Sequence, residues 1–129
     1  MDDIKKWLFS RPIAHRGLHD LQAPENTLAA FEKAKAANYP IELDVRGIDD
    51  ETIIVFHDDK LSRLTGNDGY VGNLVKENLK NYNILKTDQT IPTFEDVLKL
   101  INGQVPLLIE IKNTNKVGKF EKKIIEMLK

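Results

Sequence analysis

Short apolar runs alternate along the chain with segments in which apolar residues recur at helical spacing. The runs predict four strands, at residues 12–15, 41–45, 53–56 and 107–112. Helical spacing predicts one helix after Asn26 and one after Thr93, each a good N-cap, and a last helix over 120–128. This alternation is typical of a mainly parallel α/β sheet. No repeat, linker or low-complexity tract divides the chain, so a single domain over 1–129 is expected.

The link between the second and third predicted strands is unusually short. Only the residues 46–52 separate Val45 from Ile53, whereas a crossover between parallel strands takes about a dozen residues or more. Judged by this local rule, the two strands should form an antiparallel hairpin. Residues 60–90 follow as a polar insertion rich in Gly and Asn, with one or two helical turns expected at 74–79.

Composition and charge exclude several classes of function. Lys and Arg number 19 against 20 Asp and Glu, a net charge of −1, so no field draws the protein to nucleic acid. No run approaches the roughly 20 apolar residues of a membrane span, and the first residues lack the features of a secretory signal. We therefore expect a cytoplasmic protein without stable membrane insertion. Cysteine is absent, so the chemistry must come from histidine, carboxylates and cationic groups.

Every predicted strand carries or ends in ionisable residues, where a buried strand would normally hold Val, Ile or Leu. Each of these residues also has a plainer interpretation: a core histidine, a solvated turn, the wet side of an exposed strand, or a surface ion pair of Glu110 with Lys112. If the strands formed no site, all of these plainer interpretations would have to apply at the same time. Because functional side chains of parallel α/β folds gather at the carboxyl ends of strands, one shared site is favoured.

The acidic and imidazole members of this set suggest metal-assisted proton transfer. Glu42, Asp44 and Glu110 supply the oxygen ligands that a hard divalent cation such as Mg²⁺ or Ca²⁺ prefers. His15 and His57 can share general acid and general base work near neutral pH.

The cationic members suggest that the substrate is an anion. Arg16 can hold a phosphate through its planar fork, and Lys112 can hold it as a point charge. The chain lacks the Gly-rich loops that cradle nucleotide phosphates. Together with a cation and two proton-transfer groups, this set suits the cleavage of a phosphate ester.

Seven ordered stretches of the chain resemble the glycerophosphodiester phosphodiesterase family. They are Ala14-His15-Arg16-Gly17 and residues 24–31, 41–45, 55–59, 61–66, 91–94 and 108–112. The resemblance implies a TIM barrel. In such phosphodiesterase barrels the second and third strands are joined without a normal helix. On that ground we expect a short connector between parallel strands in place of the hairpin.

The resemblance also implies an activity: hydrolysis of small-molecule glycerophosphodiesters, such as deacylated phospholipids, to glycerol 3-phosphate and an alcohol. The roles implied are metal ligation by Glu42, Asp44 and Glu110, acid/base catalysis by His15 and His57, and phosphate binding by Arg16 and Lys112. In this scheme one histidine assists the attacking hydroxyl and the other protonates the leaving alcohol. His19 matches no role and is expected at the surface, and residues 60–90 are expected to cover the glycerol end of the substrate.

Length separates this chain from a full barrel. A (β/α)₈ barrel takes about 250 residues, whereas the chain has 129 and four predicted strands, which correspond to an N-terminal half. Three explanations stay open: a fragment of a longer enzyme, a half-barrel that closes as a homodimer, or a stand-alone domain without catalysis. The functional alternatives are a non-catalytic phosphate- or metal-binding or assembly module, and a phospholipase-D-like enzyme of the same barrel group.

Overall fold

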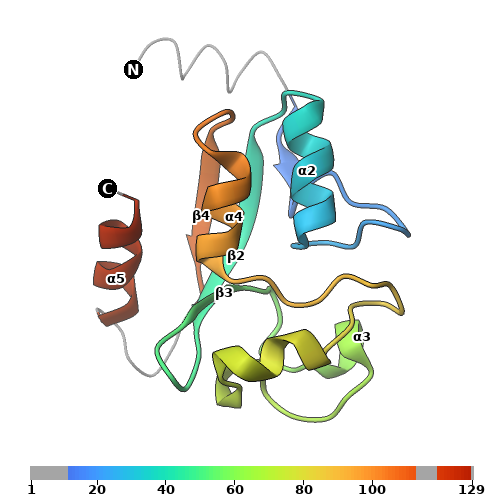
Figure 1. Cartoon of the computed structure of the whole chain (residues 1–129), viewed down its shortest axis with the longest axis vertical. Coiled ribbons are helices and arrows are strands. Elements are labelled where there is room, and N and C mark those ends of the chain that lie inside the picture. Colours follow the sequence, from blue (N-terminus) through green and yellow to red (C-terminus); the bar gives the residue numbers. More distant parts are fainter. Residues whose placement is uncertain (1–11, 113–118, 129) are drawn as a thin grey trace.

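The computed structural model of the protein describes residues 12–112 and 119–128 (Figure 1). The elements follow one another as β1 (Ala14–His15), α2 (Leu28–Ala36), β2 (Ile41–Gly47), β3 (Ile53–Val55), α3 (Ser62–Thr65), the 3₁₀ helices η1 (Val71–Asn73) and η2 (Lys76–Asn81), α4 (Phe94–Ile101), β4 (Leu107–Ile111) and α5 (Lys119–Met127). In this part of the chain, no helix has both the length and the apolar character that a membrane crossing requires.

Strand β2 is the centre of a parallel sheet. β1 pairs with its first residues, Ala14 opposite Ile41, and β4 runs beside it from Ile41 to Val45. Helices α2 and α4 pack side by side over one face of this sheet (Figure 1). The apolar core lies between the helices and the strands. Its fully buried members include Phe31 and Leu43, and α5 adds Phe120 and Ile124.

Beyond Val45 the sheet changes direction. Strand β3 returns antiparallel along the end of β2, with Val45 opposite Val55 and Gly47 opposite Ile53. Glu51 adopts a left-handed conformation, φ 70°, in the turn between them. The expectation of a parallel connector was therefore wrong, and the local rule was right, because seven residues cannot cross back over a sheet. Of the four strands described, β1, β2 and β4 are the parallel ones.

Residues 48–92, which include β3 and α3 and end before α4, contain a second core. From here on we call these residues the insertion; they lie at the carboxyl end of β2 (Figure 1). The core of the insertion consists of Ile48, Ile54, Phe56, Leu61, Leu64, Val71, Leu74, Leu79, Ile84 and Ile91. It thus extends to both sides of the predicted 60–90 segment. The helical turn expected at 74–79 is present as η2.

The N-caps of α4 and α2 can be compared with the caps predicted from the sequence. Thr93 caps α4, and its hydroxyl oxygen accepts from the Asp96 N–H at 3.0 Å, as expected. Helix α2 begins one residue later than predicted: Thr27 is the N-cap and accepts from the Ala30 N–H at 3.2 Å. Asn26 precedes the helix in a left-handed conformation, φ 54°. Its side chain is therefore released from capping and is used elsewhere.

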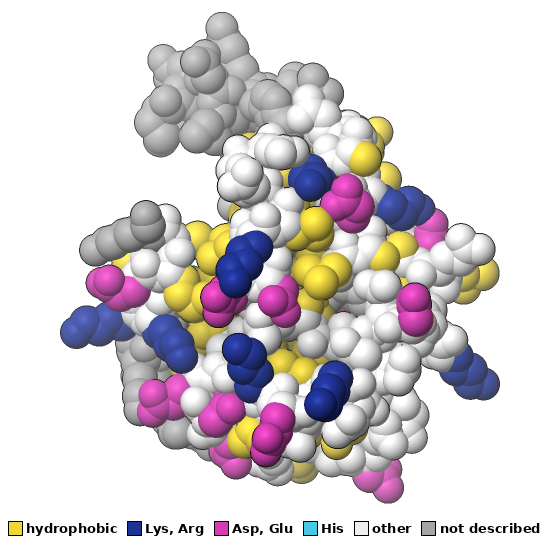
Figure 2. Space-filling view, in the orientation of Figure 1, with side chains coloured by type: hydrophobic (Ala, Val, Ile, Leu, Met, Phe, Trp, Pro, Cys, Tyr) yellow, Lys and Arg dark blue, Asp and Glu magenta, His cyan; other side chains and the backbone are white. Residues whose placement is uncertain are grey.

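Charges of both signs are interspersed over the helix-covered face of the molecule. Figure 2 shows Lys and Arg side chains beside Asp and Glu across that face, without a patch of one sign. Such a surface offers no concentrated field to a polyanion.

Candidate active site

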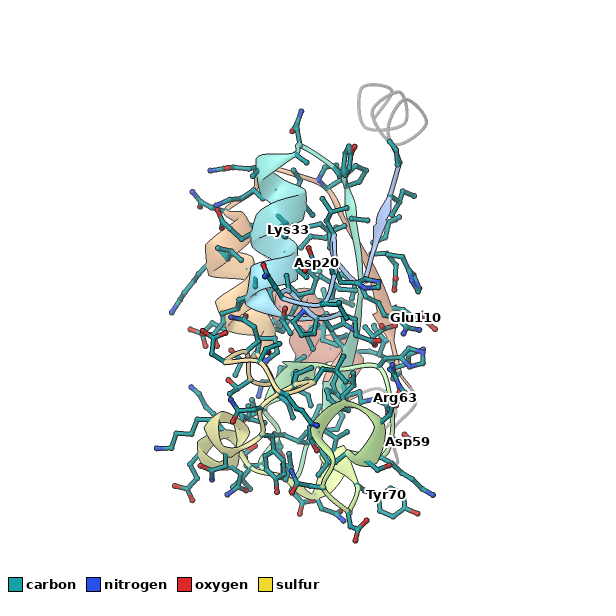
Figure 3. The ribbon with its side chains drawn as sticks, turned by 90° about the vertical axis from the view of Figure 1, so that its right-hand side faces the viewer. Asp20, Lys33, Asp59, Arg63, Tyr70 and Glu110 are labelled. Atoms are coloured by element: carbon teal, nitrogen blue, oxygen red, sulfur yellow. The ribbon has the colours of Figure 1, made fainter. Side chains whose placement is uncertain are left out.

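The three predicted metal ligands meet on the face of the sheet that the helices leave open. Along β2, Leu43 points into the core, so Glu42 and Asp44 point to the opposite face. Asp44 lies in register with Glu110 of β4. Figure 3 shows Glu110 on the side of the sheet away from the helix that carries Lys33. One carboxylate oxygen from each of the three residues lies within 4.8 Å of the others.

The negative charge of Glu42 is the least compensated in this cluster. Both of its carboxylate oxygens are buried and accept no hydrogen bond from any residue that the structure describes. Burial, and secondarily the nearby charge of Asp44, raise the pKa of Glu42 above its ordinary value. The Nε2 atom of His15 lies 3.3 Å from one oxygen, but that imidazole is 66% exposed. A buried, unsatisfied carboxylate beside two others is a donor set that fits a hard divalent cation.

Lys112 lies at the end of β4 among the same carboxylates. Its ammonium nitrogen is 2.9 Å from Glu110 and 3.6 Å from Asp44. The hydrogen bond and the charge of Lys112 lower the pKa of Glu110. The surface ion pair considered for Glu110 and Lys112 is therefore present, and it extends to the buried Asp44.

Asp44 is held by two further side chains from the first β/α connection. The Asn26 amide donates to its Oδ2 atom at 3.0 Å, and the Arg16 Nε atom lies 3.5 Å from the same oxygen. Asp44 is 1% exposed. The left-handed backbone at Asn26 turns its side chain toward the site. This contact was missed by the sequence analysis, which used Asn26 as a helix cap.

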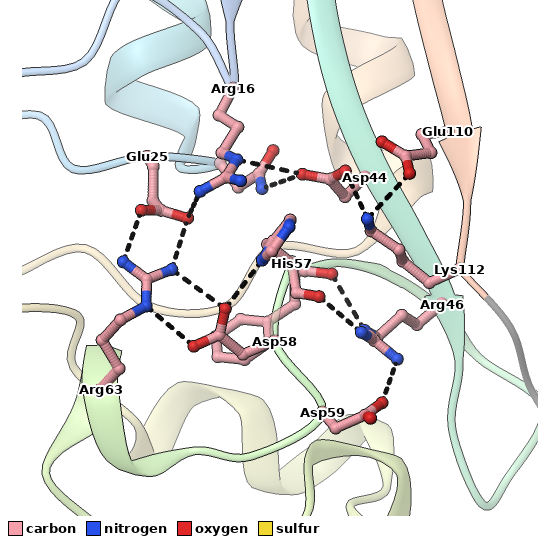
Figure 4. A network of polar contacts seen from close by, with 12 residues as sticks. Arg16, Glu25, Asp44, Arg46, His57, Asp58, Asp59, Arg63, Glu110 and Lys112 are labelled. Atoms are coloured by element: carbon pink, nitrogen blue, oxygen red, sulfur yellow. Dashed lines mark hydrogen bonds and ion pairs between the residues drawn. The ribbon is translucent and has the colours of Figure 1, made fainter.

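A chain of ion pairs leads from Arg16 to the second histidine (Figure 4). The Arg16 Nη1 atom donates to Glu25 at 3.0 Å. Arg63 then donates to both oxygens of Glu25, each at 2.9 Å, and through Nε and Nη2 to both oxygens of Asp58 at 2.8 and 3.1 Å. Burial raises the pKa of Glu25, but Arg63 and Arg16 together bring it below its ordinary value.

His57 is positioned by its neighbour in sequence. Its Nδ1 atom lies 2.8 Å from Asp58 Oδ1, and the ring lies between Asp58 and Asp44 in Figure 4. Hydrogen bonds from Arg63, opposed by burial and supported by His57, lower the pKa of Asp58 from 3.8 to about 2. Asp58 is therefore ionised near neutral pH and can accept a hydrogen bond from Nδ1 of His57. The Nε2 atom is then the ring nitrogen available to other groups.

The backbone at His57 has its own support from β2. Arg46 donates through Nε to the Phe56 carbonyl at 3.2 Å and through Nη2 to the carbonyl of His57. Its Nη1 atom donates to Asp59 at 2.7 Å. Strand β2 thus fixes the course of the chain where it leaves β3.

Six of the seven predicted site residues lie together. Glu42, Asp44 and Glu110 form the cluster, and His15, Arg16 and Lys112 each lie within 3.6 Å of at least one of its members. His57 is linked to them through Asp58, Arg63, Glu25 and Arg16. His19 is exposed, as expected. Glu25 and Arg63 were present in the family-like stretches, but no role was assigned to them.

Comparison with known proteins identifies the family. The model of the glycerophosphoryl diester phosphodiesterase family matches residues 15–129. The chain belongs to this family. The resemblance inferred from the seven stretches is thereby confirmed.

Relatives within the phosphodiesterase family are longer than this chain. It is 42% identical over 107 residues to the protein YhdW of Bacillus subtilis (strain 168), covering 78% of this chain and 44% of that one. It is 34% identical over 126 residues to the glycerophosphodiester phosphodiesterase of Bacillus altitudinis, covering 90% and 51%. The chain thus spans about half the length of the curated relatives it matches.

Solved structures show the same relation. The structure of an Oleispira antarctica phosphodiesterase in complex with the product sn-glycerol-3-phosphate is 31% identical, with a TM-score of 0.81 over 92% of this chain and 51% of that one. The fold is therefore that of a TIM-barrel phosphodiesterase of which this chain contains the N-terminal half, as predicted.

Proposed function

We propose that this phosphodiesterase-family protein hydrolyses glycerophosphodiesters to glycerol 3-phosphate and an alcohol in a metal-dependent reaction. Family membership supports the reaction class, and the complex of the Oleispira antarctica relative with its product supports the glycerol 3-phosphate end of the substrate. The observation that carries the proposal is the Glu42 carboxylate beside Asp44 and Glu110, whose buried oxygens accept no hydrogen bond from the described residues.

Glu42, Asp44 and Glu110 would hold Mg²⁺ or Ca²⁺. Carboxylate oxygens are the preferred ligands of both ions, and a cation would satisfy the Glu42 oxygens that no other group in the described chain hydrogen-bonds. When bound, a divalent ion supplies Lewis-acid neutralisation of phosphate oxygens. Asn26 keeps the Asp44 carboxylate in one orientation through its 3.0 Å hydrogen bond.

Arg16 and Lys112 would bind the phosphate. Both cations already lie within 3.6 Å of Asp44, and each directly follows a strand, Arg16 after β1 and Lys112 after β4. Their side chains are 20% and 19% exposed, which leaves each partly accessible to a ligand. Two fixed positive charges at the same place stabilise the negative charge that develops as the ester bond breaks.

The two histidines would divide the proton transfers. His15 would take the proton of the attacking hydroxyl, and its exposed ring is accessible from the open face of the sheet. His57 would give a proton from Nε2 to the oxygen of the leaving alcohol as the phosphorus–oxygen bond breaks. Asp58, held ionised by Arg63, orients the ring through its contact with Nδ1.

The test is release of glycerol 3-phosphate from glycerophosphocholine by the 129-residue chain, with Mg²⁺ or Ca²⁺ and with a chelator. We expect release that stops in the chelator and in Glu42→Gln. The matched control is Glu95→Gln, which removes one carboxylate of the exposed Glu95–Lys99 pair and should change nothing. Calorimetric titration of each ion into the same samples measures binding separately.

Each other outcome assigns a different function. A folded chain that binds the ion but releases no product would be either the non-catalytic binding or assembly module or a half-barrel that needs further strands for turnover. Release of head group from intact phosphatidylcholine alone would indicate a phospholipase-D-like enzyme. A chain that binds neither ion would overturn the metal-dependent mechanism. A cytoplasmic location and the pairing of two copies stay predictions from the sequence.

A further inference from the structure

We propose that Arg63 is a positioning residue of the active site, which sets the orientation of His57 through Asp58 and of Arg16 through Glu25. This inference rests on the proposed function for its catalytic meaning, but its structural content can be tested without turnover. The contacts that support it are four hydrogen bonds between 2.8 and 3.1 Å, which use three nitrogens of a single guanidinium.

The geometry of these contacts requires an arginine. Its fork grips both oxygens of Glu25 on one edge, while Nε and Nη2 grip both oxygens of Asp58 on another. Two carboxylate planes are therefore fixed at once, and neither can rotate freely. A lysine could satisfy the charge but offers only one nitrogen, so it cannot fix either plane.

The first carboxylate governs the second histidine. Asp58 Oδ1 receives both the Arg63 Nη2 hydrogen bond and the contact with His57 Nδ1. With the carboxylate fixed, the neutral ring keeps its proton on Nδ1 and directs Nε2 away from Asp58, toward the side where Asp44 lies in Figure 4. Loss of Arg63 would let the carboxylate turn, and the ring would lose the partner that selects its tautomer.

The second carboxylate governs the phosphate-binding arginine. Glu25 is 8% exposed and connects Arg63 to Arg16 Nη1, and the Nε atom of Arg16 lies 3.5 Å from Asp44. Glu25 belongs to the connection after β1, whereas Arg63 belongs to α3 in the insertion. The hydrogen bonds between Arg63 and Glu25 therefore join two regions that are 38 positions apart in sequence.

Arg63 is itself fixed by the short helix that carries it. Its neighbours Leu61 and Leu64 are buried in the core of the insertion, so the helix is anchored on one side. Gly66 ends the helix in a left-handed backbone conformation, φ 75°, which residues other than glycine rarely adopt. The Arg63 side chain remains 49% exposed and extends over the surface to reach both carboxylates.

The test uses ¹⁵N-histidine-labelled chain and a long-range ¹H–¹⁵N spectrum, which reports the tautomer of each of the three histidines. In the wild type we expect neutral His57 to carry its proton on Nδ1. In Arg63→Gln and Arg63→Lys we expect a mixture in which Nε2–H, the form favoured by free imidazole, gains. Arg63→Lys retains the charge and the aliphatic stem, so it is the variant that stays folded if Arg63→Gln does not.

Lys99→Gln is the control, because it breaks an exposed ion pair on α4 and should leave the His57 signals unchanged. In the activity assay both Arg63 variants should lower kcat by about ten- to a hundredfold. A tautomer that shifts in a chain without activity supports the positioning role and rejects the proposed function. A tautomer that stays on Nδ1 in both Arg63 variants overturns the positioning role, whatever the activity does.

Discussion

The α/β region and the insertion hold their functional side chains by different means. In the α/β region, Glu42, Asp44 and Glu110 stand on strands whose backbones are paired, so their positions follow from sheet register. The insertion contains short helical turns and isolated bridges, such as Lys60 with Tyr70. There, His57 is positioned by its ion pair with Asp58 and by the Arg46 hydrogen bond to its carbonyl. Regular strand pairing fixes the carboxylate cluster, whereas side-chain ion pairs position His57.

The two hydrophobic cores make this contrast testable by large-to-small substitution. Phe31 of the α/β region and Phe56 of the insertion are both fully buried. Each change to Ala should cost about 3–5 kcal/mol of unfolding free energy. Hydrogen exchange should show general loss of protection in Phe31→Ala, and loss confined largely to residues 48–92 in Phe56→Ala. Equal loss everywhere in both variants would show a single cooperative unit and remove the contrast.

The histidines sharpen the comparison, because one stands in each region. His15→Ala and His57→Ala should each lower kcat for glycerophosphodiester cleavage by at least about a hundredfold, the usual contribution of a general acid or base. His19→Ala is the matched control, since His19 is exposed in the connection after β1. A loss below that size at His15 would remove its role as the base.

Gly47 tests how α5 is joined to the sheet. A Cβ atom at this position would lie 2.2 Å from the Phe120 ring. Gly47→Ala should therefore cost about 1–3 kcal/mol, because the ring must move out of the core. Chemical denaturation measures the loss, and combining the change with Phe120→Leu should restore part of it. A Gly47→Ala variant as stable as wild type would show that α5 moves without cost.

The smallest effect concerns pH. Arg63 first, with His57, holds the pKa of Asp58 at about 2 against the ordinary 3.8, although burial opposes this. Ionised Asp58 therefore stabilises the folded state at any pH above about 4, and this contribution is lost as the pH falls from 3.8 toward 2. Because Arg63 is 49% exposed, we expect less than about 1 kcal/mol.

Thermal unfolding of wild type and Asp58→Asn at several pH values measures this contribution. The wild type should lose stability more steeply than the variant between pH 4 and pH 2. At pH 2 the two curves should converge. Parallel curves over the whole range would mean that Asp58 gains nothing from Arg63 in the folded state.

Sequence predicted the α/β region well and the insertion poorly, for physical reasons. Strand residues such as Leu43 and Ile109 can be recognised from the hydrophobicity of their local sequence. Thr93 caps a helix through a hydrogen bond to a residue three positions away. Alternation on β2 then places Glu42 and Asp44 on one face. Rules of this kind depend only on neighbours in sequence, so they can be applied before the fold is known.

The contacts that were missed depend on the assembled fold. Arg63 reaches Glu25 across 38 positions, and nothing local to either residue specifies the other. Connector length alone predicts the antiparallel return of β3, whereas the family resemblance predicts a parallel connector. The residue type of Asn26 suits a helix cap, but its neighbour Thr27 is the cap in the structure.

The antiparallel return of β3 has a consequence for the evolution of the fold. Val55 donates to the Pro92 carbonyl at 3.0 Å, and Ile54 forms a bridge with Thr93. The chain thus leaves the α/β region and re-enters it at adjacent points, with its own hydrophobic interior between them. A segment tied at its base in this way can be lengthened, shortened or exchanged with little strain on the strands that support it. The insertion can therefore diversify while Glu42, Asp44 and Glu110 stay in place on their strands.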